Sequence, residues 1–271
     1  MCSHPIQAKK NTGELFIVYM LLRQMPLSLH MVKEKRGGAQ MSDYLDMLSV
    51  LGIAGAHPGG LQLTKQLMDE WDLPFPARIL DAGCGTGQTL HYLSQLGHQP
   101  EGVDADPRMV NKARNRLQSA VPVSVGLIEN LPAKNNQFDA VLCESVLSFS
   151  RTESALKEIW RVLKDGGRLA AAEMTLENAL PEEDEKEIAG FYKFTGLLTE
   201  KEWIAAIEAA GFHDVRFMQH DRGLLDQNQP DHELDMDENI PPEIFEVLDT
   251  HRHILQKYKK ALGFRLYLAE K

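Results

Sequence analysis

Short apolar runs recur at regular intervals between residues 78 and 174, and they predict a sheet interleaved with helices. Five of these runs have the length and composition of buried strands, at 78–80, 100–104, 121–125, 138–143 and 168–174. Segments with helical spacing of apolar positions lie between most of them, at 88–96, 106–117 and 152–163. Alternation of strand and helix predicts a parallel sheet with right-handed crossovers. We therefore expect a doubly wound α/β fold.

The flanking segments predict further helices and two more strands. Thr199 and Glu202 form a capping box that opens a helix ending before Gly211. Other expected elements are a short helix or turn at 44–51, helices at 61–71 and 242–260, and strands at 215–218 and 263–269. Residues 181–187 read as a solvated helix start, whereas residues 191–194 give no clear period. The acidic stretch 221–243, rich in Pro and Asn, predicts a loop or lid.

Composition narrows the class of protein without naming a function. The 271 residues are 43% hydrophobic and 25% charged, as in ordinary globular proteins. A net charge of −10 argues against a surface that tracks nucleic acid. Cys2, Cys84 and Cys143 have neither disulfide nor metal-ligand spacing. We expect a cytoplasmic protein with no metal site and no membrane contact.

The first forty residues differ from the rest. They hold six lysines and arginines against two acids, a net +4, which leaves −14 for residues 41–271. The apolar run Leu15–Leu22 is too short to span a bilayer. Arg36-Gly37-Gly38 can be encoded by a bacterial ribosome-binding sequence placed just before the codon of Met41. We expect residues 1–40 to be a non-native or disordered upstream extension, the alternative being an amphipathic N-terminal helix, and residues 41–271 to form one domain.

The stretch from Arg78 to Gly87 joins the first strand to a helix through Gly83, Gly85 and Gly87. A strand, a glycine turn and a helix form the nucleotide-binding opening of this fold class. The dinucleotide fingerprint requires a third glycine where Gln88 stands, and Asp81 would repel a pyrophosphate. Asp104 follows about 20 residues later, where an acid accepts hydrogen bonds from ribose hydroxyls. The pattern favours a ligand with a ribose and an amino group but no phosphate, which describes S-adenosyl-L-methionine.

The motifs around this turn resemble those of the class I S-adenosylmethionine-dependent methyltransferases. Leu80–Gly87 resembles their first motif, and Gly102-Val103-Asp104 their second. Further similar segments, in the family's order, are Glu129–Pro132, Phe138–Val141 and Arg161–Gly167. His57-Pro58-Gly59-Gly60 with Thr64 resembles a segment that covers the cofactor in some small-molecule members. The resemblance spans residues 57–174, with 175–271 expected to supply lid elements and the final strands.

The resemblance implies a mostly parallel seven-stranded sheet whose last strand is antiparallel, with S-adenosyl-L-methionine as cosubstrate. Asp81 would lie near the amino group of the cofactor and Asp104 would hold its ribose. Many relatives have an acid for the adenine amino group where this chain has Leu127. The full set of implied cofactor-binding residues is Gly60, Asp81, Gly83, Cys84, Gly85, Gly87, Asp104, Ala105, Met109, Leu127, Ile128 and Glu129.

Methyl transfer from a sulfonium is an in-line displacement in which the protein mainly aligns donor and acceptor. Glu144 and Ser145 follow the fourth strand and are candidates for the catalytic side of the site, as is His57. The alternatives are a solvated carboxylate, an N-cap and a surface histidine. Glu173 faces either the site or solvent, and the aromatic residues 192 and 194 either shape an acceptor pocket or fill a core.

The acceptor is not readable from the sequence, although a small molecule under a lid fits the acidic chain better than nucleic acid. Two other classes stay open: a cofactor-binding regulatory protein, and an enzyme that uses S-adenosylmethionine without methylating. The oligomeric state is not predicted.

Overall fold

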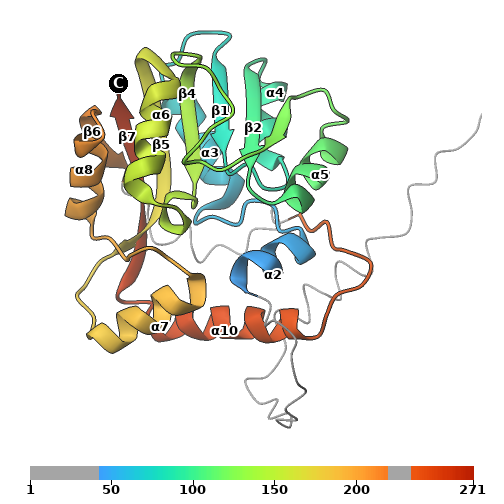
Figure 1. Cartoon of the computed structure of the whole chain (residues 1–271), viewed down its shortest axis with the longest axis vertical. Helices are drawn as coiled ribbons and strands as arrows, with labels where there is room; N and C mark the ends of the chain where they lie inside the picture. The colour runs from blue at the N-terminus through green and yellow to red at the C-terminus, as the bar shows by residue number, and fades with distance from the viewer. Residues whose placement is uncertain (1–42, 219–232) are drawn as a thin grey trace, which may run out of the picture. The chain divides into compact units, whose positions relative to one another are not determined.

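The structure is a computed structural model that describes residues 43–218 and 233–271. The predictions for residues 1–40, and for residues 219–232 of the expected lid, lie outside these ranges. The described residues form a sheet of seven strands in the order β3-β2-β1-β4-β5-β7-β6 (Figure 1). The strands are β1 Arg78–Ala82, β2 Gln99–Asp104, β3 Val123–Val125, β4 Phe138–Glu144, β5 Leu163–Leu176, β6 His213–Met218 and β7 Leu262–Glu270.

The strand directions confirm the predicted fold class. Strands β1 to β5 pair in parallel. The last strand, β7, lies between β5 and β6 and pairs antiparallel with both. Because the carboxyl ends of β1 to β5 share one edge, residues that follow these strands converge there.

The helices cover both faces of the sheet and also the end at which the parallel strands finish. They are α2 Tyr44–Leu51, α3 Gly60–Glu70, α4 Gln88–Gln95, α5 Pro107–Arg116, α6 Thr152–Val162, α7 Glu182–Tyr192, α8 Glu200–Ala209 and α10 Glu243–Lys257, with a short 3₁₀ helix, η1, at Leu147–Phe149. Helices α6 and α8 pack on one face, and α3 and α4 on the other, with α5 beside α4. Figure 1 places α2, α7 and α10 beyond the carboxyl ends of the parallel strands.

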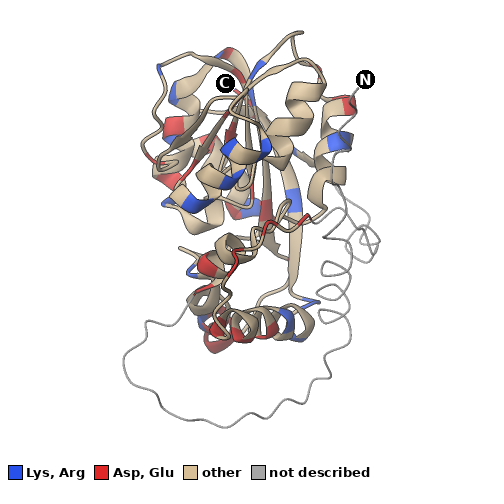
Figure 2. Ribbon diagram, turned by 90° about the vertical axis from the view of Figure 1, so that its right-hand side faces the viewer, with Lys and Arg blue, Asp and Glu red and all other residues tan. Residues whose placement is uncertain are grey.

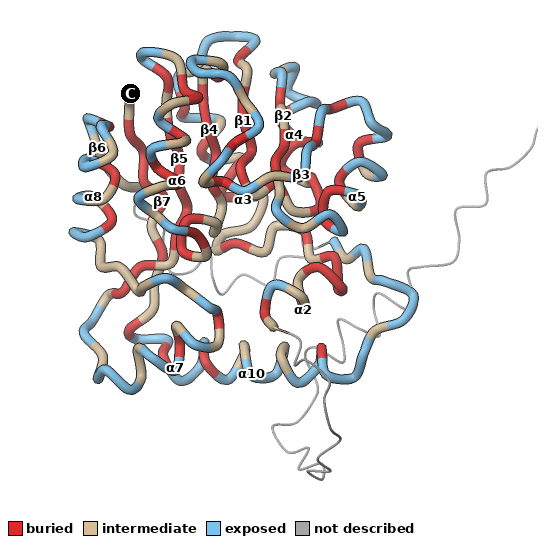
Figure 3. Tube along the Cα trace, viewed as in Figure 1, coloured by how far each residue is buried: buried red, intermediate tan, exposed pale blue. Residues whose placement is uncertain are grey.

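Side chains of successive strand residues point to opposite faces, so each face has its own core. In β1, Ile79 packs with the α3 side and Leu80 with the α6 side. In β4, Leu142 likewise packs on the α3 side and Cys143 on the α6 side. Figure 3 shows the buried positions concentrated in the strands, whereas α7 and α10 are exposed along much of their length.

The largest differences from the predicted boundaries are at the start of β5 and at the end of α7. Strand β5 begins at Leu163, not 168, because Leu163 already pairs with Phe138 before a register shift in the ladder. Helix α7 extends to Tyr192, through residues that showed no clear period. Its buried positions, Ile188 and Tyr192, are four residues apart, and Lys193 ends the helix in the left-handed region at φ 59°. The helix carries few apolar positions, which explains the weak signal.

Candidate active site

The glycine turn after β1 needs two of its glycines for different reasons. Gly83 has φ 87°, and a Cβ there would lie 2.2 Å from Cγ2 of Val146. Gly85 has φ 50°, but no atom lies within 4 Å of the position its Cβ would take. Both conformations favour glycine. Gly83 thus permits close packing against the loop after β4, whereas Gly85 leaves open space beside the turn.

A cavity of about 300 Å³ lies at this turn, along the carboxyl ends of β2, β1 and β4. Leu45 and Leu48 of α2, and Ile53 after it, line its other side. Most of the residues predicted as a site line this cavity: His57, Asp81, Gly83, Cys84, Gly85, Asp104, Ala105, Met109, Leu127, Ile128, Glu129, Glu144 and Ser145. The structure therefore brings together residues that the sequence spreads over nearly ninety positions.

Two predicted cofactor residues are not among those that line the cavity. Gly60 is the first residue of α3, and the residue before it, Gly59, is the N-cap. Gly87 is the N-cap of α4, with φ 77°, and a Cβ there would lie 3.0 Å from Cβ of Ala113 on α5. Gly87 allows two helices to approach each other instead of lining the cavity.

Three acids stand in a row at the cavity, one at the carboxyl end of each of three neighbouring strands. Asp104 ends β2, Asp81 lies in β1 and Glu144 ends β4. Asp104 Oδ2 accepts the N–H of Gly85 at 2.9 Å, and its Oδ1 accepts the N–H of Asp106 at 2.9 Å. These two bonds fix the Asp104 carboxylate across the glycine turn.

Asp81 is the most deeply buried of the three acids. It is 2% exposed, and its Oδ2 has no hydrogen-bond partner among the described residues. Burial, then the neighbouring charges of Glu144 and Asp104, raise the pKa of Asp81 well above its ordinary value. A buried carboxyl without a partner is costly. A cation bound beside it would remove that cost.

Glu144 is held by two threonines and lies beside a histidine. Its Oε1 accepts the hydroxyl of Thr64 at 2.5 Å, and its Oε2 accepts that of Thr89 at 2.8 Å. Nε2 of His57 lies 3.4 Å from the same Oε2. The Glu144 side chain is only 8% exposed, so the alternative of a solvated carboxylate is wrong. His57 is also buried, at 8% exposure, and is not a surface histidine.

Ser145 follows directly and has a strained backbone, with φ 59°. Its N–H donates to the carbonyl of Ala172 at 2.8 Å, which ties the end of β4 to β5. The residue that precedes the short helix η1 is Val146, so the alternative that Ser145 is an N-cap is wrong. A left-handed residue here turns the chain sharply at the edge of the cavity.

Glu173 is a buried residue whose role the sequence did not reveal. It is 0% exposed and points neither to the cavity nor to solvent. Its carboxylate accepts the N–H groups of Val146, Leu147 and Ser148 at 2.9, 2.8 and 3.2 Å and the Ser148 hydroxyl at 2.8 Å. Glu173 thus holds the turn that carries Val146 and Phe149 into the cavity wall.

The aromatic residues 192 and 194 lie behind the cavity wall. Phe149 lines the cavity, and its ring contacts those of Phe194 and Tyr44 at centroid distances of 4.8 and 6.0 Å. Tyr192 stacks on Phe194 and accepts or donates a hydrogen bond with Nδ1 of His251 at 2.8 Å. Residues 192 and 194 are therefore not among the residues that line the cavity. They pack behind Phe149 and support the wall that it forms.

A basic stripe on α5, defined as Arg108, Lys112 and Arg116, holds two segments: α2, which lines the cavity, and residues 233–237, which pack on the chain just after α2. The three residues are four apart and so share one helix face. Arg108 pairs with Asp46 of α2 at 2.6 Å, Lys112 with Asp237 at 2.8 Å, and Arg116 with Glu233. Residues 233–237 also bond to residues 50–54 through their backbones, including Asp237 N to Val50 O at 2.9 Å. We call this arrangement of the stripe, α2 and residues 233–237 the clasp.

We expect the clasp to slow the escape of a ligand from the cavity. Lys112→Glu replaces the attraction to Asp237 by repulsion, and the bound ligand S-adenosylhomocysteine should dissociate about threefold to tenfold faster. Stopped-flow displacement measures this rate. Lys157→Glu on α6 is the control, because Lys157 also pairs with an acid, Glu153, but lies on the exposed surface. An equal rate change in both variants would contradict a role for the clasp.

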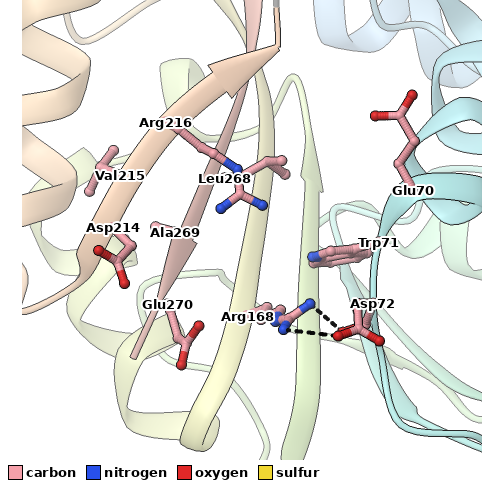
Figure 4. A pocket seen from close by; sticks show the side chains of 10 residues that line it. All are labelled: Glu70, Trp71, Asp72, Arg168, Asp214, Val215, Arg216, Leu268, Ala269 and Glu270. Carbon is pink, nitrogen blue, oxygen red and sulfur yellow. Dashed lines mark hydrogen bonds and ion pairs between the residues drawn. The ribbon is translucent and has the colours of Figure 1, made fainter.

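A second hollow, of about 540 Å³, is larger but lies elsewhere (Figure 4). Arg168, Arg216 and Glu270 line it, near Trp71 and Asp72 after α3, and Arg168 contacts Asp72. In the sheet, Arg168 near the start of β5 lies opposite Glu270 at the end of the antiparallel strand β7, and Glu270 lies opposite His213 at the start of β6. The hollow therefore lies at the amino-terminal ends of the parallel strands. Ligands of open α/β sheets bind at the opposite edge. The smaller cavity is therefore the candidate site.

Neither a metal cluster nor a membrane span is found in the part of the chain that the structure describes. No group of three or more His, Cys, Asp and Glu residues at 43–218 and 233–271 has a metal-binding arrangement. No helix within these ranges is long and apolar enough to cross a bilayer.

Comparison with known proteins shows what this chain resembles. Residues 80–171 match the family model described as a methyltransferase domain. An uncharacterized methyltransferase of Bacillus subtilis, YodH, is 41% identical over 238 residues, covering 85% of this chain and 100% of the relative. A malonyl-[acyl-carrier protein] O-methyltransferase of Herminiimonas arsenicoxydans is 34% identical over 144 residues, 51% of this chain and 53% of that protein.

Solved structures agree on the fold. The phosphoethanolamine N-methyltransferase 2 of Haemonchus contortus, in complex with S-adenosyl-L-methionine, superimposes with a TM-score of 0.67 at 18% identity. The match covers 88% of this chain and 61% of that one.

Proposed function

Because the chain belongs to the class I S-adenosylmethionine-dependent methyltransferases, we propose that the cavity at the ends of β2, β1 and β4 binds S-adenosyl-L-methionine and a small-molecule acceptor. One observation carries the placement: the buried carboxyl of Asp81, at the glycine turn, has an oxygen without a partner. The amino group of the cofactor is a cation that satisfies this oxygen. The open space at Gly85 supports the same placement, because a side chain there would fill it.

The remaining cofactor contacts follow from the row of acids. Asp104, already fixed by two N–H groups, has lone pairs left to accept ribose hydroxyls. Ala105, Met109 and Ile128 form an apolar wall for the adenine ring. Glu129 accepts the N–H of Arg151 at 3.0 Å, and the backbone of Leu127 bonds with that of Asn130. We assign adenine recognition to residues 127–129.

The chain's own residues mainly align the reactants. When bound, the cofactor supplies a methyl group activated by a positive sulfur. The wall formed by Val146 and Phe149, which Glu173 holds, keeps water from the reacting side of the cavity. His57 lines this side, and its ring nitrogens make no hydrogen bond within the described residues. We assign His57 as the group that takes a proton from a protic acceptor, with Glu144 and Ser145 shaping the same side.

The charge of the cavity restricts the acceptor. No lysine or arginine is found among the described residues that line it, whereas five acids are: Asp81, Asp104, Asp106, Glu129 and Glu144. A phosphate or carboxylate on the acceptor would be repelled. Leu45, Leu48 and Phe149 add apolar surface. We propose an uncharged or cationic acceptor with an apolar part.

The outer surface supports a small molecule over nucleic acid. Figure 2 shows acidic and basic positions together on the helical layer that holds α7 and α10, and the whole chain has a net charge of −10. The first turn of α7 alone has four acids at residues 182–185. Such a surface repels a phosphate backbone. The free, buried thiols of Cys84 and Cys143 support a reducing, cytoplasmic setting.

The ribose role of Asp104 has a direct test. Asp104→Ala should weaken binding of S-adenosylhomocysteine by about 1–3 kcal/mol, because hydrogen-bonding groups of the ligand lose their partner. Titration calorimetry measures the change. Asp165→Ala is the control, since the Asp165 side chain is 92% exposed and distant in the fold from the cavity lining. An unchanged affinity in Asp104→Ala would reject this role.

Transfer itself is tested with a cofactor labelled on its methyl group. The full chain is incubated with the labelled cofactor and a small-molecule extract, and label is followed into products by mass spectrometry. We expect label in uncharged or cationic small molecules. Label found only in nucleic acid, in protein or in phosphorylated metabolites would contradict the proposal.

A further inference from the structure

His57 and Glu144 form a buried pair that is fixed by four parts of the fold. His57 lies just before α3, and Glu144 ends β4. The two hydroxyls that Glu144 accepts come from Thr64 on α3 and Thr89 on α4. Thr64 is 0% exposed and Thr89 6%. The Glu144 carboxylate is therefore held in one orientation, with the histidine beside it.

The two ring nitrogens of His57 have different surroundings. Nε2 lies 3.4 Å from Oε2 of Glu144, which is long for a hydrogen bond but close enough for attraction. Nδ1 is buried and has no hydrogen-bond partner within the described residues. The backbone is fixed as well, because the His57 carbonyl accepts the N–H of Gly60 at 3.0 Å. Glu144 therefore acts on one nitrogen of a ring whose other nitrogen is unengaged.

The carboxylate selects which nitrogen carries the proton. A neutral imidazole holds one proton, on either ring nitrogen, and the group beside one nitrogen decides the state of the other. Because an N–H is the positive end of a dipole, the charge of Glu144 favours the proton on Nε2. No lysine or arginine among the described lining residues competes for this carboxylate. The lone pair that can accept a proton is then on Nδ1.

We infer that Glu144 is a positioning residue, which keeps the His57 proton on Nε2 so that Nδ1 is the atom that deprotonates the acceptor; this rests on the proposed function. In the step, the bond between hydrogen and the nucleophilic atom breaks, and the proton goes to Nδ1. The electron pair of that bond forms the new bond to the methyl carbon, and the pair of the carbon–sulfur bond goes to sulfur. The resulting imidazolium lies beside the carboxylate, which stabilises it.

The tautomer of His57 can be measured without cofactor or acceptor. Long-range ¹H–¹⁵N NMR of the full chain, at about pH 9, distinguishes a protonated from an unprotonated ring nitrogen in neutral imidazoles. The His57 signals are those lost in His57→Gln. We expect Nε2 to be protonated and Nδ1 to be unprotonated. In Glu144→Gln the ratio of the Nε2–H to the Nδ1–H form should fall at least about fivefold, because the neighbouring charge is removed.

Further variants separate this role from a purely structural one. Glu144→Asp keeps the charge but draws it back, so the ratio should fall by only about twofold. This variant also carries the test if Glu144→Gln does not fold. Glu153→Gln removes the same charge from α6, where the side chain is 80% exposed, and should leave the ratio unchanged. If Glu144 only joins α3 and α4 to β4, its variants will lose stability without changing the ratio.

The outcomes distinguish the two proposals. An unchanged ratio in both Glu144 variants, or a proton on Nδ1 in the unaltered chain, would overturn the positioning role and leave the proposed function standing. Absence of S-adenosylmethionine binding to the unaltered chain would overturn the proposed function and the part of Nδ1 in transfer, whatever the tautomer.

Discussion

Glu173→Ala should lower the free energy of unfolding by about 3–5 kcal/mol, the loss typical of removing one partner from a buried charged network. Four donors of residues 146–148 would lose their acceptor, in a place where the side chain is 0% exposed. Urea unfolding monitored by circular dichroism measures the change. Glu208→Ala, on the exposed side of α8, is the control and should change stability by less than about 0.5 kcal/mol. Similar values for the two variants would contradict the role of Glu173.

The same carboxyl predicts a pH dependence. Burial raises the pKa of Glu173 to about 7 in the folded chain, from an ordinary value of 4.5. The folded state therefore holds a proton that the unfolded state releases, and the stability from this group, present below pH 4.5, is lost as pH rises toward 7. The difference in unfolding free energy between the unaltered chain and Glu173→Gln should fall by roughly 3 kcal/mol from pH 4.5 to 8. A constant difference would contradict the shifted pKa.

Gly83→Ala should damage both the fold and cofactor binding. Its Cβ would lie 2.2 Å from Val146 Cγ2, and φ is 87°, so overpacking and left-handed strain add to about 2–4 kcal/mol. The turn must shift, and cofactor affinity should fall at least about tenfold. Thermal unfolding and calorimetry measure the two effects.

Gly85→Ala is the matched control for that experiment. No atom lies within 4 Å of its Cβ position, so stability should fall by only about 1–2 kcal/mol, from the left-handed backbone. Cofactor affinity should still fall, because the methyl group fills space that the ligand needs. Val146→Ala combined with Gly83→Ala should recover part of the lost stability, since it removes the atoms that clash. No recovery would show that the close approach to Val146 is not the cause.

The sequence predicted the sheet well because its strands are short, apolar and separated by clear helix signals. Arg78–Gly87 identified the strand, turn and helix, and Asp81 with Asp104 identified the kind of ligand. These inferences succeed because local spacing fixes which residues follow a strand, and parallel strands bring such residues to one edge. The antiparallel last strand came from the resemblance alone.

Contacts that join distant segments were not predictable in the same way. Glu173 has the pattern of a strand residue, and only the packing of β5 against the loop after β4 shows that it binds residues 146–148. The clasp depends on Arg108, Lys112 and Arg116 meeting acids more than sixty positions away, although their spacing of four was a usable signal. Gly87 matched a ligand motif, and the close approach of Ala113 on α5 gives a second reason for a glycine there that the motif spacing does not reveal.

Titration calorimetry of the full chain with S-adenosylmethionine and with NAD shows which of the two ligands the cavity binds. We predict saturable binding of S-adenosylmethionine at one site, no binding of NAD, and at least about a tenfold weaker interaction in Asp81→Asn, where the charge facing the amino group is removed. Binding of NAD without binding of S-adenosylmethionine would contradict the assignment of this cavity to S-adenosylmethionine.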